Sequence, residues 1–555
     1  MSKAQSDVAM ADLEKNPYTT FDPEVHYATA SLDTADTTTS LPAPLQKLHR
    51  LAQKLDIETR GIEPVPENLR TPASLWSAGS MWLAANLVIS TFTIGTLGSA
   101  IFGCAFWDSI ATIIFFNMLG IIPVAYFSTF GAKMGMRQMV ITRYSFGYVG
   151  AWGISLLNVI ACVGWSATNV IVGAQLIKAV NNSFPLWAGI VIITLATVAI
   201  TTFGYKVVHI YEKWSWIPAF IIFLIMIAEI ARSGAFQITP MPTGATEAAS
   251  VLSFGGTIYG FATGWTSYAA DYTTYQPRSI SSWKVFASVY ISLLFPLCFV
   301  EFIGAAAITM IDTPKYGDAY TANSIGGLVG AILSPLGRFG SFCLVVMALS
   351  IIANNCPNQY SFGLSVQTWG GWFQRIPRFI WNVLGAGIII AIAIPGSTRF
   401  TTVLENFLNL IAYWLAIYFV IVLEEHLIFR RGQFSNYDLS AWNSPSKLPV
   451  GVAAVGAFCV GVAGFVVGMD QVWFVGPVGK GIGAFGGDVG FELAAAFAGV
   501  TYPVARMVEK SFENLMVLLF VVNSKDAQKA LFQQPRANPP PSPSVSCIAI
   551  AIKCK

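Results

Sequence analysis

The sequence predicts an all-α polytopic membrane protein with about twelve transmembrane helices, and three observations carry this prediction. Hydrophobic residues make up 54% of the 555 residues and charged residues only 11%, whereas soluble domains carry about 25% charged residues. The mean hydropathy is +0.60. Apolar runs follow one another almost without interruption from Trp76 to Arg506. One membrane domain therefore explains the composition better than several soluble domains.

Each predicted span is an apolar run of about 20 residues, the length that a helix needs to cross the hydrocarbon core. Backbone polar groups in that core must be paired within the helix itself. A shorter apolar stretch, 324–334, is expected to lie outside the membrane or to re-enter it. The spans are expected at 76–100, 107–130, 147–179, 186–203, 210–231, 252–272, 284–311, 338–356, 378–395, 402–423, 449–468 and 487–506.

The two ends of the chain differ from this core. We expect a disordered cytosolic tail at 1–72, the transmembrane transporter domain at 73–506 and a cytosolic tail at 507–555. The first tail is polar and lacks the apolar segment of a signal peptide, and the second is rich in proline. If the N-terminus is cytosolic, the inner loops hold most of the lysines and arginines between the spans. The positive-inside rule therefore predicts that both termini lie in the cytosol.

Several functional classes are disfavoured by the composition. The formal net charge of +3 gives no reason to expect a nucleic-acid partner. None of the four histidines has a metal-ligand neighbour at short spacing, and the eight cysteines form no C-x-x-C pair. The sequence therefore indicates no metal, no cofactor and no disulfide framework. A membrane enzyme would need a constellation of histidine, cysteine or carboxylate residues, and none is visible.

Glycines interrupt the first and the sixth span. Gly95 and Gly98 lie in the middle of the first span, and Gly255, Gly256, Gly260 and Gly264 lie in the sixth. If spans one to five and six to ten form two repeats, these segments occupy matching positions, which is typical of a transport site near the membrane midplane. Close packing of helices at the glycines is the alternative explanation.

Two tryptophans, Trp165 and Trp265, lie in the middle of their spans. Tryptophans of membrane proteins normally lie at the membrane–water interfaces, so these two need another reason. Two indoles that face one cavity would sandwich a flat aromatic ligand, and each stacked pair contributes roughly 0.5–1.5 kcal/mol beyond burial. The filling of a gap between helices is the alternative for either residue.

Asparagines supply polar groups near the indoles. Asn169 follows Trp165 by four residues, so both side chains project from one helical face. Pro357 is expected to disturb the end of the eighth span, and Asn355 and Asn358 flank it. A carboxamide offers both a donor and an acceptor, so it matches the adjacent donor and acceptor of a purine or an aminopyrimidine. Hydrogen bonding between helices is the structural alternative.

Carboxylates within or near the spans are candidates for proton coupling. Glu301 lies well inside the seventh span, where a carboxylate should be protonated, paired or functional. Glu405 lies closer to the end of its span, and Asp271 lies at a span end. For Glu301, a permanently protonated acid that bonds a neighbouring helix is the alternative.

Several long motifs recur in one known family of transporters. They are RGIEPVP before the first span, LVISTFTIGTLG within it, FWDSIATIIFFNMLG in the second, YSFGYVGAW in the third, GWTSYAADYTTYQP in the sixth, NNCPNQYSFGLSVQ in the eighth and FLNLIAYWLAIY in the tenth. With these motifs the sequence resembles the purine-cytosine permease branch of the nucleobase–cation symporters, in its fungal form, over about residues 60–506. The tail after Ser511 departs from the family pattern.

The resemblance implies two inverted five-helix repeats, as in the leucine-transporter architecture, followed by two C-terminal helices. It implies proton-driven uptake of adenine, guanine, hypoxanthine and cytosine across the plasma membrane. The substrate-binding positions that it implies are Ser90, Trp165, Asn169, Trp265, Asn355, Pro357 and Asn358.

Three alternatives to nucleobase uptake stay open. A vitamin B6 carrier of the same family is close, because pyridoxine is also a flat, neutral and polar heteroaromatic. A channel or a non-transporting sensor is a second class, although a sensor would need a large soluble output domain and neither tail is one. A membrane enzyme is the third.

Overall fold

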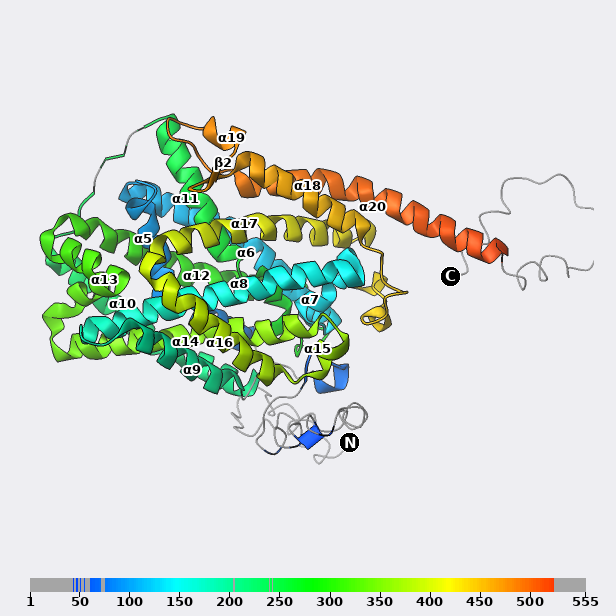
Figure 1. Ribbon diagram of the computed structural model, residues 1–555, viewed down its shortest axis with the longest axis horizontal. Helices are drawn as coiled ribbons and strands as arrows, with labels where there is room; N and C mark the ends of the chain where they lie inside the picture. Colours follow the sequence, from blue (N-terminus) through cyan, green and yellow to red (C-terminus); the bar gives the residue numbers. More distant parts are fainter. Residues whose placement is uncertain are drawn as a thin grey trace, which may run out of the picture.

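The computed structural model describes residues 60–70, 75–202, 205–238, 240–241 and 243–523, together with the isolated positions 43, 46, 47, 50 and 54. The described chain is mostly helical, and most helices run side by side across the molecule (Figure 1). Two short antiparallel strands, β1 (Asp470–Gln471) and β2 (Phe474–Val475), form a small hairpin. The predicted all-α class is confirmed.

Each predicted span overlaps a helix or a helix pair. In chain order these are α4 (Leu75–Asn86) with α5 (Ile89–Ala100), α6 (Phe106–Met134), α8 (Arg143–Val180), α9 (Leu186–Thr202), α10 (Tyr205–Ser233), α11 (Ala245–Thr263) with the 3-10 helix η2 (Thr266–Tyr272), α12 (Ser282–Ile308), α14 (Arg338–Gln367), α16 (Arg378–Gly396), α17 (Phe400–Glu424), α18 (Val452–Gly468) and α20 (Gly490–Asn523). The connecting helices are η1 (Glu67–Leu69), α7 (Gln138–Ile141), η3 (Thr309–Asp312), α13 (Pro314–Leu333), η4 (Ser334–Leu336), α15 (Gly371–Arg375), η5 (Ser397–Arg399), the π-helix η6 (Glu425–Phe429), η7 (Phe434–Asn436), η8 (Leu439–Ala441) and α19 (Pro477–Lys480).

Length and apolar composition differ among these helices. Among the described residues, six helical stretches are long and apolar enough to cross a membrane, and the bent pair of α4 and α5 makes a seventh. One of the six, Arg378–Phe429, contains both α16 and α17, and the apolar helices α9 and α18 have only 17 residues each. The number of spans is therefore read from the packing of the helices as well as from their length.

Some boundaries differ from the prediction. The eighth span was expected to end at 356, but α14 continues through Pro357 to Gln367. Proline is tolerated inside transmembrane helices because neighbouring helices satisfy the freed backbone groups. The stretch 324–334 forms the second part of α13, which is broken at Asn323 and Ser324. The last helix, α20, continues to Asn523, past the expected domain boundary at 506.

The packing of the first ten spans repeats after five. The first span (α4 and α5) packs against the seventh (α12), and the sixth (α11) packs against the second (α6). The first also contacts the fifth (α10), and the sixth contacts the tenth (α17) in the same way. The fourth and ninth spans, α9 and α16, pack on each other. This is the pattern expected for two five-helix repeats, with α18 and α20 packed beside α17 (Figure 1).

One end of the helix bundle carries the segment that precedes the first span. The backbone N–H of Val65 donates to Gly135 O at the end of α6, at 2.8 Å. The Glu67 carboxylate accepts from the backbone N–H of Arg278 at 3.0 Å. At the same end, Arg143 donates from Nη1 to Trp442 O at 2.8 Å. We call this end, which also carries α7 and α15, the N-terminal face.

Candidate substrate site

The first and the sixth span are both interrupted, and the two interruptions meet. Leu87 and Val88 separate α4 from α5, whose axes differ by 56°. In the sixth span, α11 ends at Thr263 and gives way to a 3-10 helix. Trp265, at this second break, donates from Nε1 to Asn86 Oδ1 at 3.3 Å. The pairing of interrupted segments that the sequence predicts is therefore present in the structure.

The glycines of the first span do not make its break, whereas Gly264 lies at the break of the sixth span, directly after α11. Gly95 and Gly98 lie within the regular helix α5, seven or more residues after the break at Val88. A Cβ on Gly95 would lie 2.0 Å from Glu301 O, and a Cβ on Gly260 would lie 2.2 Å from Leu408 O. These glycines let neighbouring helices approach closely, which is the alternative that their positions in the sequence left open. The expectation that Gly95 and Gly98 mark the break itself was wrong.

An asparagine from another span stabilises the first break. The carbonyl of Ala85, in the last turn of α4, accepts a hydrogen bond from Asn354 Nδ2 at 2.6 Å. Helix termini leave backbone carbonyls without partners in the helix, and a buried unpaired carbonyl is costly. Asn354 therefore stabilises the end of α4 in the interior of the protein, where water does not reach it.

Four asparagines form a connected amide cluster between α8 and α14: Asn169, Asn354, Asn355 and Asn358. Asn169 Nδ2 donates to Asn354 Oδ1 at 2.7 Å and to Asn355 Oδ1 at 2.8 Å. Asn358 Nδ2 donates to Asn354 O at 2.9 Å. The hydroxyl of Tyr268, in η2, donates to Asn358 Oδ1 at 2.7 Å. The amide cluster thus connects both breaks with the third and the eighth span.

A small cavity lies beside the amide cluster. Its volume is about 10 Å³, which is room for about one water molecule. Trp165 and Asn169 line it from α8, as the four-residue spacing predicts, and Ser90 lines it from α5. No ionised side chain lines this cavity within the described ranges. The remaining lining residues are Thr93, Ile94, Thr168, Val172, Phe261, Phe400 and Leu404.

Two hydrogen-bonding atoms remain available at this cavity. Ser90 Oγ is buried and has no hydrogen-bond partner among the residues that the structure describes. Both amide hydrogens of Asn169 are used within the amide cluster, which leaves its Oδ1 as the free acceptor. The site therefore offers a hydroxyl and a carbonyl oxygen to a neutral ligand.

The two mid-span indoles occupy different surroundings. Trp165 makes edge-to-face contacts with Phe261 and Phe407, at 5.4 and 5.0 Å between ring centroids. Trp265 contacts Trp82 and Tyr268 in the same manner, at 5.5 and 5.8 Å. Of the residues implied by the family resemblance, Trp265, Asn355, Pro357 and Asn358 do not line the small cavity. The sandwich of a ligand between the two indoles stays a prediction.

Several residues of this region escaped the sequence analysis. Asn354 directly precedes Asn355, and only the packing of α4 against α14 shows that its side chain reaches Ala85 O. Asn86 lies next to the break in the sixth span only after folding. Tyr268 is close to that break in the sequence, but its contact with Asn358 depends on folding. A polar residue next to the end of an interrupted helix was the available signal for Asn86.

The three candidate carboxylates lie in different places. Glu301 is fully buried in α12, and its Oε2 accepts from Asn117 Nδ2 at 2.6 Å, while Oε1 has no partner in the described chain. Asp271 lies at the end of η2, where its Oδ1 accepts from the backbone N–H of Gln138 at 2.7 Å. Arg137 Nη1 donates to the backbone oxygen of Asp271 at 2.7 Å. Glu405 is half-buried on α17.

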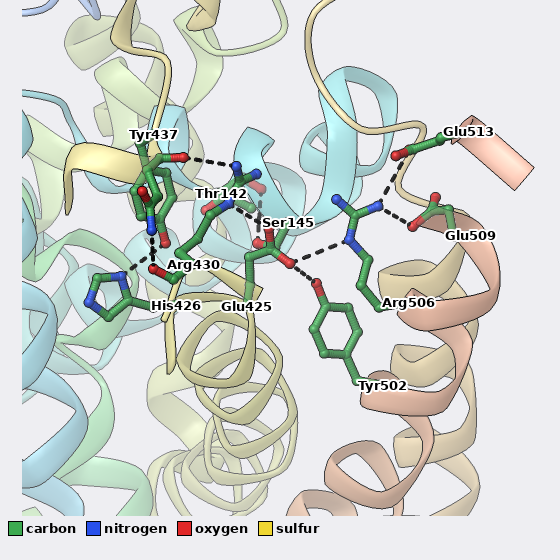
Figure 2. Close-up of polar contacts among 11 residues, drawn as sticks. Thr142, Ser145, Glu425, His426, Arg430, Tyr437, Tyr502, Arg506, Glu509 and Glu513 are labelled. Carbon is green, nitrogen blue, oxygen red and sulfur yellow. Dashed lines mark hydrogen bonds and ion pairs between the residues drawn. The ribbon is translucent and has the colours of Figure 1, made fainter. Parts of the chain in front are cut away.

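A second polar network, which we call the charged cluster, lies at the N-terminal face (Figure 2). Glu425, the first residue of η6, is buried and pairs with Arg430 Nε at 2.9 Å. Its other oxygen accepts from the hydroxyl of Tyr502 at 2.9 Å and lies 3.4 Å from Arg506 Nε. Tyr502 and Arg506 belong to α20, so this carboxylate connects the end of the tenth span to the last helix.

The charged cluster continues along α20. Arg506 Nη1 pairs with Glu509 at 2.8 Å and with Glu513 at 3.4 Å. Glu509 Oε1 in turn accepts from the backbone N–H groups of Gly451 and Val452, at 2.8 and 2.9 Å. These are the free donors at the start of α18, where a carboxylate is a favourable cap. The charged cluster therefore joins α17, α18 and α20.

No group of three or more histidine, cysteine, aspartate or glutamate residues that could hold a metal ion occurs in the described part of the chain. The candidate site consists of amides, hydroxyls and aromatic rings. Such groups bind by hydrogen bonding and stacking.

Comparison with known proteins identifies relatives along most of the chain. Residues 64–477 match the family described as permease for cytosine/purines, uracil, thiamine, allantoin. A purine-cytosine permease of Emericella nidulans is 52% identical over 508 residues, which cover 90% of this chain and 98% of the relative. A purine-cytosine permease of Saccharomyces cerevisiae is 46% identical, with 84% of this chain and 89% of the relative covered. A vitamin B6 transporter of the same yeast is 30% identical, with 83% and 89% covered.

The fold is similar to that of a solved transporter. Mhp1, a nucleobase-cation-symport-1 family transporter, in a closed conformation with bromovinylhydantoin bound, matches with a TM-score of 0.63 at 16% identity, over 82% of this chain and 96% of that chain. Its inward-facing conformation gives a TM-score of 0.60 at 15% identity, with the same coverage. This likeness shows the fold, which is the predicted leucine-transporter-like arrangement of two inverted five-helix repeats plus two C-terminal helices. The chain is a polytopic membrane transporter and not an enzyme, and it belongs to the family of permeases for cytosine/purines, uracil, thiamine and allantoin.

Proposed function

We propose that this protein imports nucleobases (adenine, guanine, hypoxanthine and cytosine) in symport with protons, by alternating access, across the plasma membrane. The observation that carries the proposal is the meeting of two interrupted helices at a buried amide cluster and a cavity lined by no ionised side chain among the described residues. Interrupted helices in matching positions of two repeats are typical of a transport site. Neutral donors and acceptors suit a neutral, hydrogen-bonding heterocycle better than an ion.

In this proposal the residues have distinct roles. Trp165 stacks on the flat ring, and Ser90 Oγ and Asn169 Oδ1 bond its polar edge. Asn355 and Asn358, which flank Pro357, hold the ligand from α14 once the cavity opens, and Trp265 closes over the ring from the sixth span. A cavity of about 10 Å³ is too small for a nucleobase, so in this proposal α5 and η2 move away from α8 and α14 before a nucleobase enters.

Relatives support nucleobases over the vitamin B6 alternative. The chain is 52% and 46% identical to two purine-cytosine permeases and 30% identical to a vitamin B6 transporter. The lysines and arginines of the loops on the N-terminal face, such as Lys133 and Arg278, favour a cytosolic orientation of that face. Both termini are accordingly proposed to be cytosolic.

Uptake measurements in cells that lack their own permeases test this function. Labelled adenine or cytosine should enter by a saturable process that becomes faster as the external pH falls, because protons drive it. Pyridoxine should compete poorly. Saturable uptake of pyridoxine without uptake of adenine or cytosine would support the vitamin B6 alternative instead.

Glu301 is the first candidate for the coupled proton, followed by Glu405 and Asp271. Helix α5 presents Ser90, Thr93 and Ile94 to the cavity and Gly95 to the backbone of Glu301. A change of charge on Glu301 would therefore act on the helix that lines the substrate site. Asp271 is held by a backbone N–H and lies beside Arg137, which favours a structural role for it.

The substitution Glu301→Gln tests the coupling step. Glutamine keeps the shape and can still accept from Asn117, but it cannot ionise. We expect a variant that exchanges labelled adenine across the membrane but does not accumulate it and no longer responds to external pH. If Glu301→Gln concentrates adenine with unchanged pH dependence, the coupled proton is carried elsewhere, and Glu405 and Asp271 are the next residues to test.

A further inference from the structure

A large groove lies on the side of α8 that faces away from the amide cluster. Its volume is about 620 Å³, far above that of the cavity beside Ser90. Val163 and Ile171 of α8, Leu384 and Ile388 of α16 and Phe407 of α17 are among its lining residues. The polar side chain in the lining is that of Thr168, and its hydroxyl already donates to backbone oxygens at 3.0 and 3.1 Å. Among the described residues that line it, the groove therefore offers no free hydrogen-bonding side chain to a polar ligand.

The groove is open to the surface that faces lipid. Ile160, Leu384 and Ile388 line it and are 56%, 52% and 46% exposed. They belong to spans of a polytopic membrane protein, so their exposed faces meet hydrocarbon. Along α16 the lining extends from Trp381 to Gly396, a rise of about 22 Å at 1.5 Å per residue. That length is most of the roughly 30 Å thickness of the hydrocarbon core.

Two tryptophans close the groove toward the N-terminal face. Trp369 donates from Nε1 to Trp152 O, and Trp381 donates from Nε1 to Phe373 O, both at 3.3 Å. Their N–H groups are thus satisfied, and their rings line the groove. Indoles in this arrangement are typical of the level of lipid headgroups. The exposed Arg375, on α15 at the same end of the bundle, provides a positive charge near that level.

We propose that this groove binds one acyl chain of a membrane phospholipid, whose headgroup lies at the N-terminal face. An acyl chain needs no hydrogen bond within the groove, and the phosphate of a phospholipid headgroup can pair with the exposed Arg375, which a sterol hydroxyl cannot neutralise. Continuity with the lipid-facing surface gives the chain a direct way in.

The bound chain would also act on the substrate site. Phe407 lines the groove, and its ring contacts Trp165 at 5.0 Å between centroids. A Cβ on Gly164 would lie 2.2 Å from the ring of Phe407, so this ring lies directly on the backbone of α8. An acyl chain that fills the groove supports Phe407 from outside and thereby holds Trp165 at the cavity.

The binding test uses two adjacent residues of α16. Leu384 lines the groove and is 52% exposed, whereas Val383 is outside the lining and is 57% exposed. Leu384→Trp should fill the groove, and Val383→Trp adds the same ring to the lipid-facing surface as the control. The purified full-length proteins are placed in vesicles of phosphatidylcholine that carry a photoactivatable diazirine on one acyl chain. Labelled peptides are then mapped by mass spectrometry.

We expect label on residues 159–171 in the wild type and in Val383→Trp, with at least a fivefold loss in Leu384→Trp. Equal label in all three proteins would overturn the proposal, as would wild-type label no higher than that around the exposed Ile221 and Leu224 of α10. Loss of the label on addition of ergosterol would assign the groove to a sterol. This result would also contradict the acyl-chain proposal.

A transport readout tests the link to Trp165, and it rests on the proposed function. The KM for adenine should rise at least threefold in Leu384→Trp and stay within twofold of the wild type in Val383→Trp. An unchanged KM together with lost label would overturn the link through Phe407. The labelling is measured without substrate, so its outcome is independent of whether nucleobases are the transported ligands.

Discussion

The amide cluster and the charged cluster are both buried polar networks, but the first consists of neutral side chains and the second is held by charged side chains. The amide cluster lies between interrupted helices and contains neutral asparagines, of which Asn169 keeps one free acceptor. The charged cluster (Figure 2) is built around Glu425 and Arg506 and joins three helices at one end of the bundle. A neutral amide that loses a partner costs roughly 1–3 kcal/mol, whereas a buried charge that loses its partner costs roughly 3–5 kcal/mol.

This difference indicates a division of roles. A site that binds and releases its ligand in every cycle must exchange hydrogen bonds with small changes in free energy, and amides allow that. A contact that holds helices together is more stable when the separation of its partners has a large free-energy cost. We therefore expect substitutions in the amide cluster to change transport, and substitutions in the charged cluster to change stability.

The largest expected effect is on stability, in Arg506→Met. This substitution removes the buried cation that Glu425, Glu509 and Glu513 share. Glu425 keeps Arg430 as a partner, so the free energy of unfolding should fall by about 3 kcal/mol, the lower end of the range for a broken buried pair. Thermal unfolding of the purified protein in detergent measures the loss. The KM for adenine should stay within twofold of the wild type, because α20 does not reach the cavity. An Arg506→Met protein of normal stability with an altered KM would contradict the division of roles between the charged cluster and the amide cluster.

Asn358→Ala should affect transport more than stability. It removes the partner of the Tyr268 hydroxyl and one proposed contact to the substrate, which costs roughly 1–3 kcal/mol. This corresponds to about a 5- to 150-fold loss of affinity. The loss of affinity is measured by the competition of adenine, hypoxanthine and cytosine for uptake of a labelled base. Asn169→Ala, the matched variant on α8, should at least shift the preference among these bases. Unchanged relative affinities in Asn358→Ala would mean that Asn358 only joins helices.

The two indoles allow a graded series. Trp165→Ala and Trp265→Ala should each abolish or severely weaken adenine uptake while the protein still reaches the membrane. Trp265→Phe keeps a ring but loses the hydrogen bond to Asn86. It should therefore weaken the binding free energy of adenine by only about 0.5–1.5 kcal/mol. Uptake is compared at equal amounts of surface protein. Normal affinity in both alanine variants would contradict the stacking role.

The smallest effect is expected at an ion pair with one exposed partner. Arg232 pairs with Glu229 at 3.5 Å, and their side chains are 78% and 8% exposed. Arg232→Met should change the free energy of unfolding by no more than about 1 kcal/mol. Thermal unfolding beside Arg506→Met provides the measurement. A loss as large as that in Arg506→Met would mean that burial does not explain the strength of the charged cluster.

Local composition predicted the spans well, because the length of an apolar run is a property of the sequence itself. The matching interruptions of the first and sixth spans could be predicted for the same reason. Their positions could not, because the break after Asn86 is stabilised by Asn354, which lies far away in the sequence. The eighth span was expected to end at 356, with Pro357 disturbing that end, but the surrounding helices allow α14 to continue to Gln367. The charged cluster was also not predicted, since Glu425 and Arg506 meet only when α20 packs on α17.

The central claim is that the neutral site at the two breaks binds a nucleobase and that protons drive its transport. Purified protein in liposomes, with an imposed pH gradient that is acidic outside, tests it directly by the uptake of labelled adenine. We predict accumulation above the external concentration that stops when a protonophore is added, that is retained in Arg506→Met and that is lost in Asn358→Ala. Uptake that ignores the pH gradient, or that is equally strong in Asn358→Ala, would contradict the account.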